Sequence, residues 1–413
     1  MEKINSVEKK IGTILVLILA GEAIFFLPFV LARIFRPTLL IVFDMSNLQL
    51  GSLFSVYGII AMISYLFGGP LADRFQARNL IAIALWTTSL GGFVMATVPD
   101  QAGMLWLYAF WGITSIFLFW AALIKATRIW GGNEQGKAFG FLEGGRGLMA
   151  AVLGSIVVLV FSSSSDVTSD ESSRIESFQI VIIATTLITF VAGCLSWVFI
   201  PKSENAEGSG IQIVSIREFV DSLKNPLLLQ LVVIVLCAYI GYKVTDNISL
   251  YSFEVLHMDE IEASKMASFA LWMRPIFALL AGFLADRFKS YNVLIGCFSF
   301  MLFGGLMLSM SLLGEVWLIV IIISTTVAGV YGLRGIYFAI MNEAKISLSS
   351  TGLSVGIISC IGLSPDIFMS PFMGFLLDEY SGQIGHQLIF ATLTIFSLIG
   401  LVVSYRFKQN VIG

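Results

Sequence analysis

The chain has 413 residues, of which 57% are hydrophobic and 12% charged, and its net charge is −3. Soluble domains carry about a quarter charged residues, so this composition excludes an ordinary soluble enzyme, a disulfide scaffold and a disordered chain. No basic block is present to bind nucleic acid, and two histidines with four separated cysteines predict neither a metal site nor a cofactor. The composition is typical of a protein that crosses the membrane several times.

A helix needs about 20 mostly apolar residues to cross the hydrocarbon core of a bilayer. In chain order, the sequence predicts twelve such spans, at residues 11–34, 49–69, 79–98, 103–128, 137–162, 178–200, 226–249, 263–284, 291–313, 316–340, 349–376 and 386–406. Apolar runs without alternation, such as residues 318–323, favour helices over a transmembrane β-barrel. The first apolar run is too long for a cleaved secretion signal, so we expect it to remain in the protein.

The basic residues between the spans predict the orientation. When the N-terminus is placed in the cytoplasm, only Arg33, Arg36, Arg174 and Lys265 fall outside, and the remaining basic residues of the loops fall inside. Both termini are then cytoplasmic, and the serine-rich acidic loop at 162–176 is external. We expect a multi-pass protein of the bacterial inner (plasma) membrane.

An internal repeat divides the chain into two halves. Residues 69–79 (GPLADRFQARN) recur as residues 282–292 (GFLADRFKSYN), and each copy lies between the second and third spans of six. The sequence therefore predicts an N-terminal half at 1–200, a linker at 201–225 and a C-terminal half at 226–413. Apolar residues at helical spacing in 211–224 predict an amphipathic helix on the cytoplasmic membrane face.

The duplicated G-x-L-A-D-R loop resembles the signature loop of the major facilitator superfamily, whose members are secondary transporters. The resemblance covers the whole chain through the number of spans, the loop polarity and the repeat. It differs at Gln76, where family members usually have glycine, and the second copy ends in Ser290 and Tyr291 rather than basic residues. The resemblance implies an all-α membrane protein, with twelve helices in two pseudo-symmetric halves that work by alternating access. It also implies that spans one, four, seven and ten line the central cavity.

The repeated loops predict a gate. An acid just beyond a helix C-terminus is not favoured by that helix dipole, so it would pair with a neighbouring arginine in one conformation and release it in another. The alternative is a turn that only fixes the orientation, and Arg128 could serve as a structural partner at its helix end. The predicted gating residues are Asp73, Arg74, Arg78, Arg128, Asp286 and Arg287.

Charged side chains inside the spans predict the substrate class. Each costs about 2.5–3.5 kcal/mol on insertion scales and usually faces a cavity or a partner. The spans hold Lys125, Arg128, Arg146, Lys243, Arg274 and Arg334 against Glu22, Glu143, Asp246 and Asp366. This excess of basic residues favours an organic anion as substrate. The predicted substrate-binding residues are Lys125, Arg334, Tyr331, Tyr337, Lys243, Tyr239 and Arg274.

Glu22 lies near the middle of the first span, with no basic residue within a turn of its own helix. A carboxyl group in poorly solvated surroundings readily takes up a proton, which predicts proton coupling through Glu22, with Glu143 and Asp246 as further candidates. Structural alternatives stay open. Glu143 with Arg146, and Lys243 with Asp246, are spaced three apart as in local ion pairs, and Arg274 and Asp366 each adjoin a proline that they could brace.

The sequence predicts a monomeric secondary transporter for a small organic anion, driven by proton symport. We expect no enzyme activity, because no Walker-type nucleotide motif and no nucleophile–base set can be assembled. One alternative is an anion exchanger of the organophosphate–phosphate type. Another is a transporter-like solute sensor that carries no flux.

Overall fold

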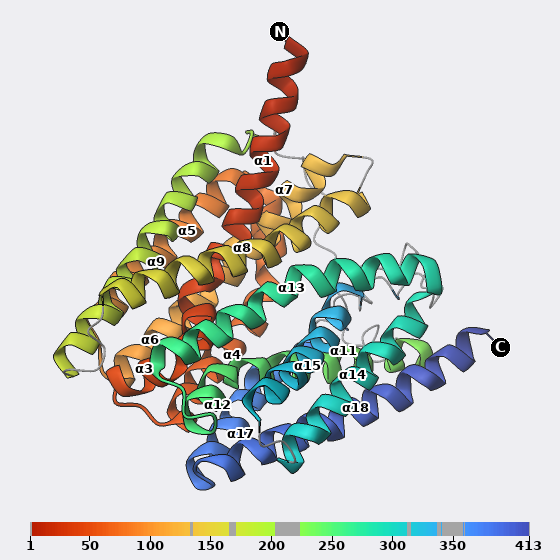
Figure 1. Cartoon of the computed structure of the whole chain (residues 1–413). Helices are drawn as coiled ribbons and strands as arrows, with labels where there is room; N and C mark the ends of the chain where they lie inside the picture. Colours follow the sequence, from red (N-terminus) through yellow and green to blue (C-terminus); the bar gives the residue numbers. More distant parts are fainter. Residues whose placement is uncertain are drawn as a thin grey trace. The chain divides into compact units, whose positions relative to one another are not determined.

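The computed structural model describes residues 2–132, 135–164, 171–202, 224–311, 315–336, 340, 358 and 360–412. These residues are mainly helical and fall into two compact units (Figure 1). Unit 1 comprises residues 1–211 and 258–272, and unit 2 comprises residues 212–257 and 273–413. Residues 258–272 thus group with unit 1, whereas the sequence places them in the second half, and the predicted domain boundaries at 200 and 226 stay a prediction.

The described residues contain twelve helical spans long and apolar enough to cross a membrane. They are Lys10–Ile34, Asn47–Tyr65, Ala77–Ala96, Gln101–Gly131, Ala138–Ser164, Glu171–Phe199, Pro226–Glu254, Glu260–Phe288, Ser290–Met310, Val316–Ile336, Cys360–Glu379 and Gln383–Ile412. The predicted all-α fold with twelve spans is confirmed. The first part of the eleventh predicted span lies almost wholly outside the described residues.

Unit 1 is built from short and long helices joined by tight turns. Its elements are α1 (Glu2–Phe25), η1 (Phe26–Val30), α2 (Leu31–Ile34), α3 (Arg36–Val42), α4 (Asn47–Arg74), α5 (Ala77–Ala96), α6 (Gln101–Gly112), η2 (Ile113–Trp120), α7 (Ala121–Gly131), α8 (Gln135–Ser164) and α9 (Glu171–Phe199). Ser46 and Gln49 form a capping box at the start of α4, and the Asp100 side chain caps α6. These caps satisfy backbone N–H groups that a helix leaves unpaired at its first turn.

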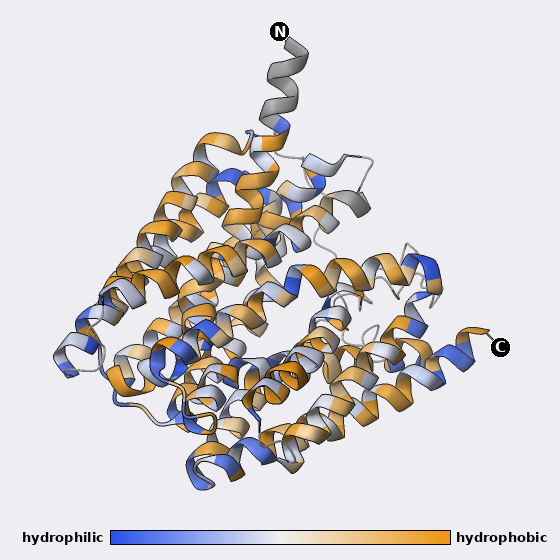
Figure 2. Cartoon of the chain, in the orientation of Figure 1, coloured by the Kyte–Doolittle hydropathy of each residue, from blue (hydrophilic) through white to orange (hydrophobic). Residues whose placement is uncertain are grey.

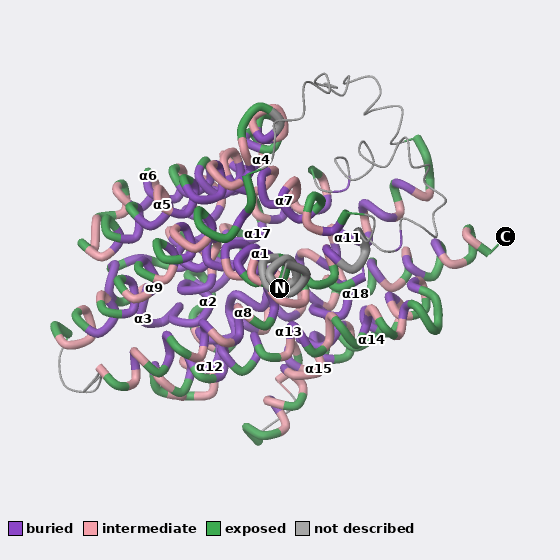
Figure 3. Tube along the Cα trace, turned by 90° about the horizontal axis from the view of Figure 1, so that it is seen from above, coloured by how far each residue is buried: buried purple, intermediate pink, exposed green. Residues whose placement is uncertain are grey.

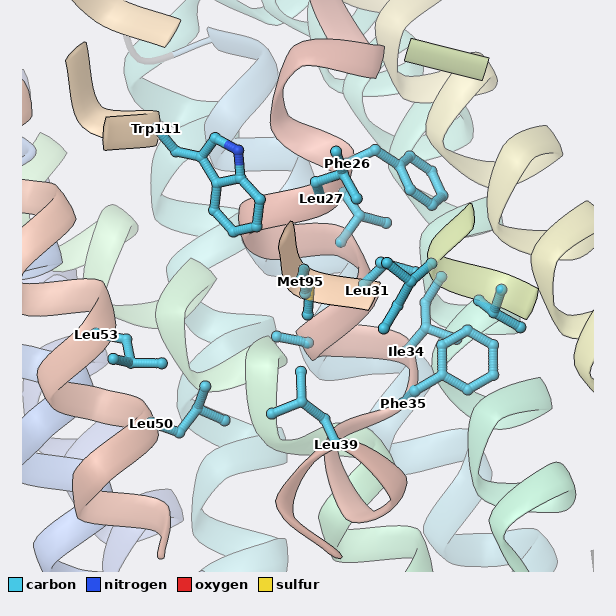
Figure 4. Close-up of a cluster of buried hydrophobic side chains, with 14 of the residues drawn as sticks. Phe26, Leu27, Leu31, Ile34, Phe35, Leu39, Leu50, Leu53, Met95 and Trp111 are labelled. Carbon is cyan, nitrogen blue, oxygen red and sulfur yellow. The ribbon is translucent and has the colours of Figure 1, made fainter. Parts of the chain in front are cut away.

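A buried apolar cluster holds the helices of unit 1 together (Figure 4). The cluster includes Phe26 and Leu27 of the first span, Met95 of α5, Trp111 of α6 and Leu50 of α4. All five side chains are almost completely buried. Close packing of this kind fixes the rotation of each helix, and so decides which polar side chains point inward.

Unit 2 has fewer but mostly longer helices. Its elements are α11 (Pro226–Val244), η3 (Thr245–Asn247), α12 (Ile248–Glu254), α13 (Glu260–Phe288, whose first part belongs to unit 1), α14 (Ser290–Met310), α15 (Val316–Ile336), α17 (Pro365–Glu379) and α18 (Gln383–Ile412). The Asn225 side chain caps α11, and Pro226 occupies the first helical position, where its missing N–H costs nothing. The predicted amphipathic helix at 211–224 lies outside the described residues except for Lys224.

Most of the helices are rich in apolar residues (Figure 2), and many of these side chains are exposed. Large exposed apolar side chains occur on spans throughout the chain, including Leu90, Leu159, Leu279 and Ile395. A soluble protein would expose such patches only at interaction sites, whereas a lipid bilayer covers them at no cost. Several charged side chains, by contrast, are buried within the units, so the surface pattern is that of a membrane-embedded bundle.

Among the described residues, three spans contain π-helical or 3-10 segments near predicted site residues. The first and fourth contain the π-helical segments η1 and η2, and the seventh contains the short 3-10 segment η3. η1 includes Pro28, which cannot donate to the helix ladder. Such local changes of helical pitch redirect side chains and are frequent at functional sites. Spans one, four and seven are also those that the family resemblance places around the cavity.

Candidate functional site

The first charged cluster lies inside unit 1, between α1 and α8. The Arg146 guanidinium lies 2.7 Å from a Glu143 carboxylate oxygen and 3.6 Å from a Glu22 oxygen. Its Nε also donates to the Gly21 carbonyl at 2.9 Å. A Cβ on residue 21 would lie 3.0 Å from Arg146 Cδ, so glycine provides the space for this approach. Glu22 therefore has a cationic neighbour, which comes from another helix.

Burial differs between the two carboxylates of this cluster. Glu22 is 2% exposed, whereas the Glu143 side chain is 53% exposed. Two aromatic rings flank the buried Arg146, with centroids 5.6 Å (Phe25) and 5.4 Å (Trp120) from the guanidinium carbon. Rings at this range attract a cation and exclude water from it. Glu22 is thus the buried acid of this cluster, and Glu143 is the exposed one.

The second charged cluster lies inside unit 2 and centres on Lys243 of α11, which is 2% exposed. Its ammonium lies 3.0 Å from an Asp246 oxygen and 3.4 Å from an Asp366 oxygen. The second Asp366 oxygen accepts a hydrogen bond from the Tyr239 hydroxyl at 2.8 Å. Asp366 of α17 and Asp246 of η3 therefore both lie beside the Lys243 ammonium of α11.

Aromatic rings connect this cluster to Arg334 of α15. The Arg334 guanidinium carbon lies 3.8 Å from the ring centroid of Tyr242, a close cation–π contact. The Tyr242 ring in turn lies 5.6 Å from that of Tyr239 and 6.4 Å from that of Tyr331, centroid to centroid. The structure thus brings Lys243, Tyr239, Tyr331, Arg334 and Asp246 together within unit 2. Their predicted roles in binding and coupling stay predictions.

Lys125 of α7 has a different environment. Its ammonium donates to the Ala72 carbonyl at 2.6 Å and to the Phe75 carbonyl at 3.4 Å. The last carbonyls of a helix lack partners within the helix and carry partial negative charge, so a lysine here stabilises the end of α4. This places Lys125 beside the predicted gating loop, and its part in substrate binding stays a prediction.

The remaining predicted residues have varied surroundings. Arg274 is buried on α13 next to Pro275. Tyr337 lies outside the described residues, and so does the side chain of Asp73. Of the other gating candidates, Arg78 lies over the Trp197 ring at 4.7 Å. The exposed candidates are Arg74, Arg128, Asp286 and Arg287.

Two buried polar contacts in unit 1 were not indicated by the sequence. Glu260 of α13 accepts a hydrogen bond from Thr38 of α3, and it lies 2.7 Å from the guanidinium of Arg174 on α9. Arg36 donates to Asn47 through two nitrogens, each at 3.1 Å. From the sequence, Arg36 and Arg174 served only to predict the orientation of the chain in the membrane. Glu260 precedes the predicted span at 263–284, and this position does not indicate its partners.

A sequence profile described as Major Facilitator Superfamily matches residues 11–346. This match extends over most of the chain, including the two repeated loops and both charged clusters except Asp366. The chain belongs to the major facilitator superfamily. It is accordingly a multi-pass secondary transporter of the membrane.

Two relatives of this chain come from Escherichia coli (strain K12). The inner membrane protein YqcE is 27% identical over 375 residues, covering 88% of this chain and 86% of the relative. The inner membrane protein YihN is 24% identical over 419 residues, covering 98% and 96%.

Solved structures share the superfamily fold. A bacterial homologue of the human lysosomal transporter Spinster matches with a TM-score of 0.73 and 13% identity over 98% of both chains. The nucleoside transporter NupG matches with a TM-score of 0.69 and 15% identity, again over 98% of both chains. At these identities the likeness concerns the fold alone.

Proposed function

We propose that this superfamily member moves a small organic anion across the inner membrane by alternating access, coupled to proton symport, with both termini in the cytoplasm. The observation that carries the proposal is the aromatic-lined charged cluster of unit 2. The Lys243 ammonium attracts an oxyanion by its charge, and the planar Arg334 guanidinium can donate two parallel hydrogen bonds to it. Tyr239 and Tyr331 add hydroxyl groups and aromatic surface.

Each unit holds three basic and two acidic residues among the predicted intramembrane charges, in unit 1 Lys125, Arg128 and Arg146 with Glu22 and Glu143, so the units differ in the contacts of these residues rather than in their net charge. Unit 2 holds Lys243, Arg274 and Arg334 against Asp246 and Asp366, which leaves one positive charge in excess. An anionic substrate would offset it, because an uncompensated charge inside the membrane is costly. In unit 1, Arg146 faces two carboxylates, Glu22 and Glu143. One bound proton would therefore make the net charge of this cluster zero. We therefore assign anion binding to unit 2 and proton coupling to unit 1.

Ligand-induced stabilisation tests the substrate class. Purified protein in mild detergent is heated with organic anions, organic cations or neutral sugars, and one class of anion is expected to raise the melting temperature. A ligand at 100 times its dissociation constant stabilises by about 2.7 kcal/mol. The shift is expected to vanish in Arg334→Gln, to be partly retained in Arg334→Lys, and to persist in Lys265→Gln, an exposed control. Stabilisation by cations alone would contradict anion binding.

Proton coupling is tested separately by accumulation in proteoliposomes. One pH unit is worth about 1.36 kcal/mol, so a one-unit gradient with one proton per anion sustains up to about tenfold accumulation. Glu22→Gln is expected to abolish this accumulation while exchange of preloaded anion continues, because glutamine cannot carry the proton. Glu379→Gln, at an exposed acid on α17, should accumulate normally. Unchanged accumulation in Glu22→Gln would reject Glu22 as the coupling residue.

The same vesicles distinguish the alternatives. Uptake that requires a preloaded anion and ignores the pH gradient would favour the exchanger. Stabilisation by an anion without any flux would favour the solute sensor.

A further inference from the structure

A groove with a volume of about 620 Å³ lies between α14 and α18 in unit 2. These two helices pack side by side along much of their length (Figures 1 and 3). The apolar part of the groove is formed by Ile295 of α14 with Leu401 and Val402 of α18. None of the charged clusters described above contributes a side chain to it.

The polar end of the groove lies toward the C-terminus of α18. Tyr405, Arg406 and Gln409 follow the apolar residues along the same helix face. The Lys408 ammonium lies 5.7 Å from the Tyr291 ring centroid, which places the end of α18 beside the start of α14. The groove is therefore amphipathic, with an apolar trough that leads to a basic mouth.

The charge around this mouth favours an anion. Arg406 lines the groove, Lys408 lies two residues further along α18 beside Tyr291, and Lys289 directly precedes α14. The residues of α18, Gln383–Ile412, include no aspartate or glutamate, and Asp286 of α13 lies beside Arg287. Basic residues at the cytoplasmic end of membrane helices attract anionic lipid head groups by about 1 kcal/mol each.

We propose that this groove binds an anionic glycerophospholipid. The phosphate lies at Arg406, and an acyl chain occupies the trough over Ile295, Leu401 and Val402. Tyr405 lies between them, where an amphipathic ring is favoured at the membrane interface. A small free anion would leave the apolar trough unused, so the shape of the groove favours the lipid over inorganic or organic phosphate.

Lipid titration followed by native mass spectrometry tests the proposal. Detergent-purified protein is titrated with dioctanoyl-phosphatidylglycerol or dioctanoyl-phosphatidylcholine, and tighter binding of phosphatidylglycerol is expected. Arg406→Gln should weaken phosphatidylglycerol binding about fivefold, the equivalent of one lost charge contact. Val402→Trp should also weaken it, because the indole fills the trough.

Matched controls separate the groove from general lipid contact. Lys202→Gln removes an exposed basic residue elsewhere, and Leu187→Trp alters an apolar position on α9 that is 49% exposed, against 45% for Val402. Both controls should bind phosphatidylglycerol as the parent does. Equal binding of the two lipids, equal losses in the controls, or full competition by glycerol phosphate would each overturn the proposal. If Val402→Trp does not fold, the titration of Arg406→Gln decides the question.

Discussion

Replacing Arg146 with methionine is expected to destabilise the detergent-solubilised protein by about 3–5 kcal/mol, since the change leaves a carboxylate buried without its cation. Glu22 is the group left behind, and the Gly21 carbonyl loses its donor at the same time. Methionine keeps the length and the apolar contacts of the arginine stem, so lost packing adds little. Thermal unfolding followed by the fluorescence of buried tryptophans measures the effect.

The double variant Glu22→Gln/Arg146→Met is the informative control. Removal of both charges takes away the stranded carboxylate, so the double variant is expected to be more stable than Arg146→Met alone. Arg128→Met, at an exposed position on α7, should change the melting temperature much less. Losses that simply add in the double variant would show that the two side chains do not interact.

Replacing Lys243 with methionine is expected to have a comparable effect in unit 2, about 3–5 kcal/mol, because two carboxylates would then lose the cation they share. Asp246 is buried, and Asp366 keeps only the hydroxyl of Tyr239 among its contacts described above. The same variant is expected to lose the anion-induced rise in melting temperature. Thermal unfolding with and without the anion measures both quantities.

A pair of milder variants shows whether the cluster acts as a unit. Tyr239→Phe removes one hydrogen bond and should cost about 1 kcal/mol. Adding Asp246→Asn to Lys243→Met should restore part of the stability but not the anion binding, because the cation is still missing. Anion binding at parental strength in Lys243→Met would remove Lys243 from the proposed site while leaving its structural role intact.

The sequence determined the membrane architecture. Each span is a run of apolar residues long enough for the bilayer, and inside lipid such a run must satisfy its own backbone, which a helix does without any partner. The ends of most spans could therefore be predicted within a few residues, and the repeated loops correctly indicated the superfamily. The pairs Glu143–Arg146 and Lys243–Asp246 were also foreseeable, since a spacing of three places both members on one helix face.

Only the tertiary structure decided which helices share their charges. Arg146 reaches Glu22 from α8, Asp366 reaches Lys243 from α17, and Lys125 is held by carbonyls at the end of α4. Glu260 of α13 likewise contacts Thr38 of α3 and Arg174 of α9. These contacts depend on the rotation and close packing of helices far apart in the chain. Hydropathy measures how much each helix prefers lipid and carries no information about which face meets which neighbour.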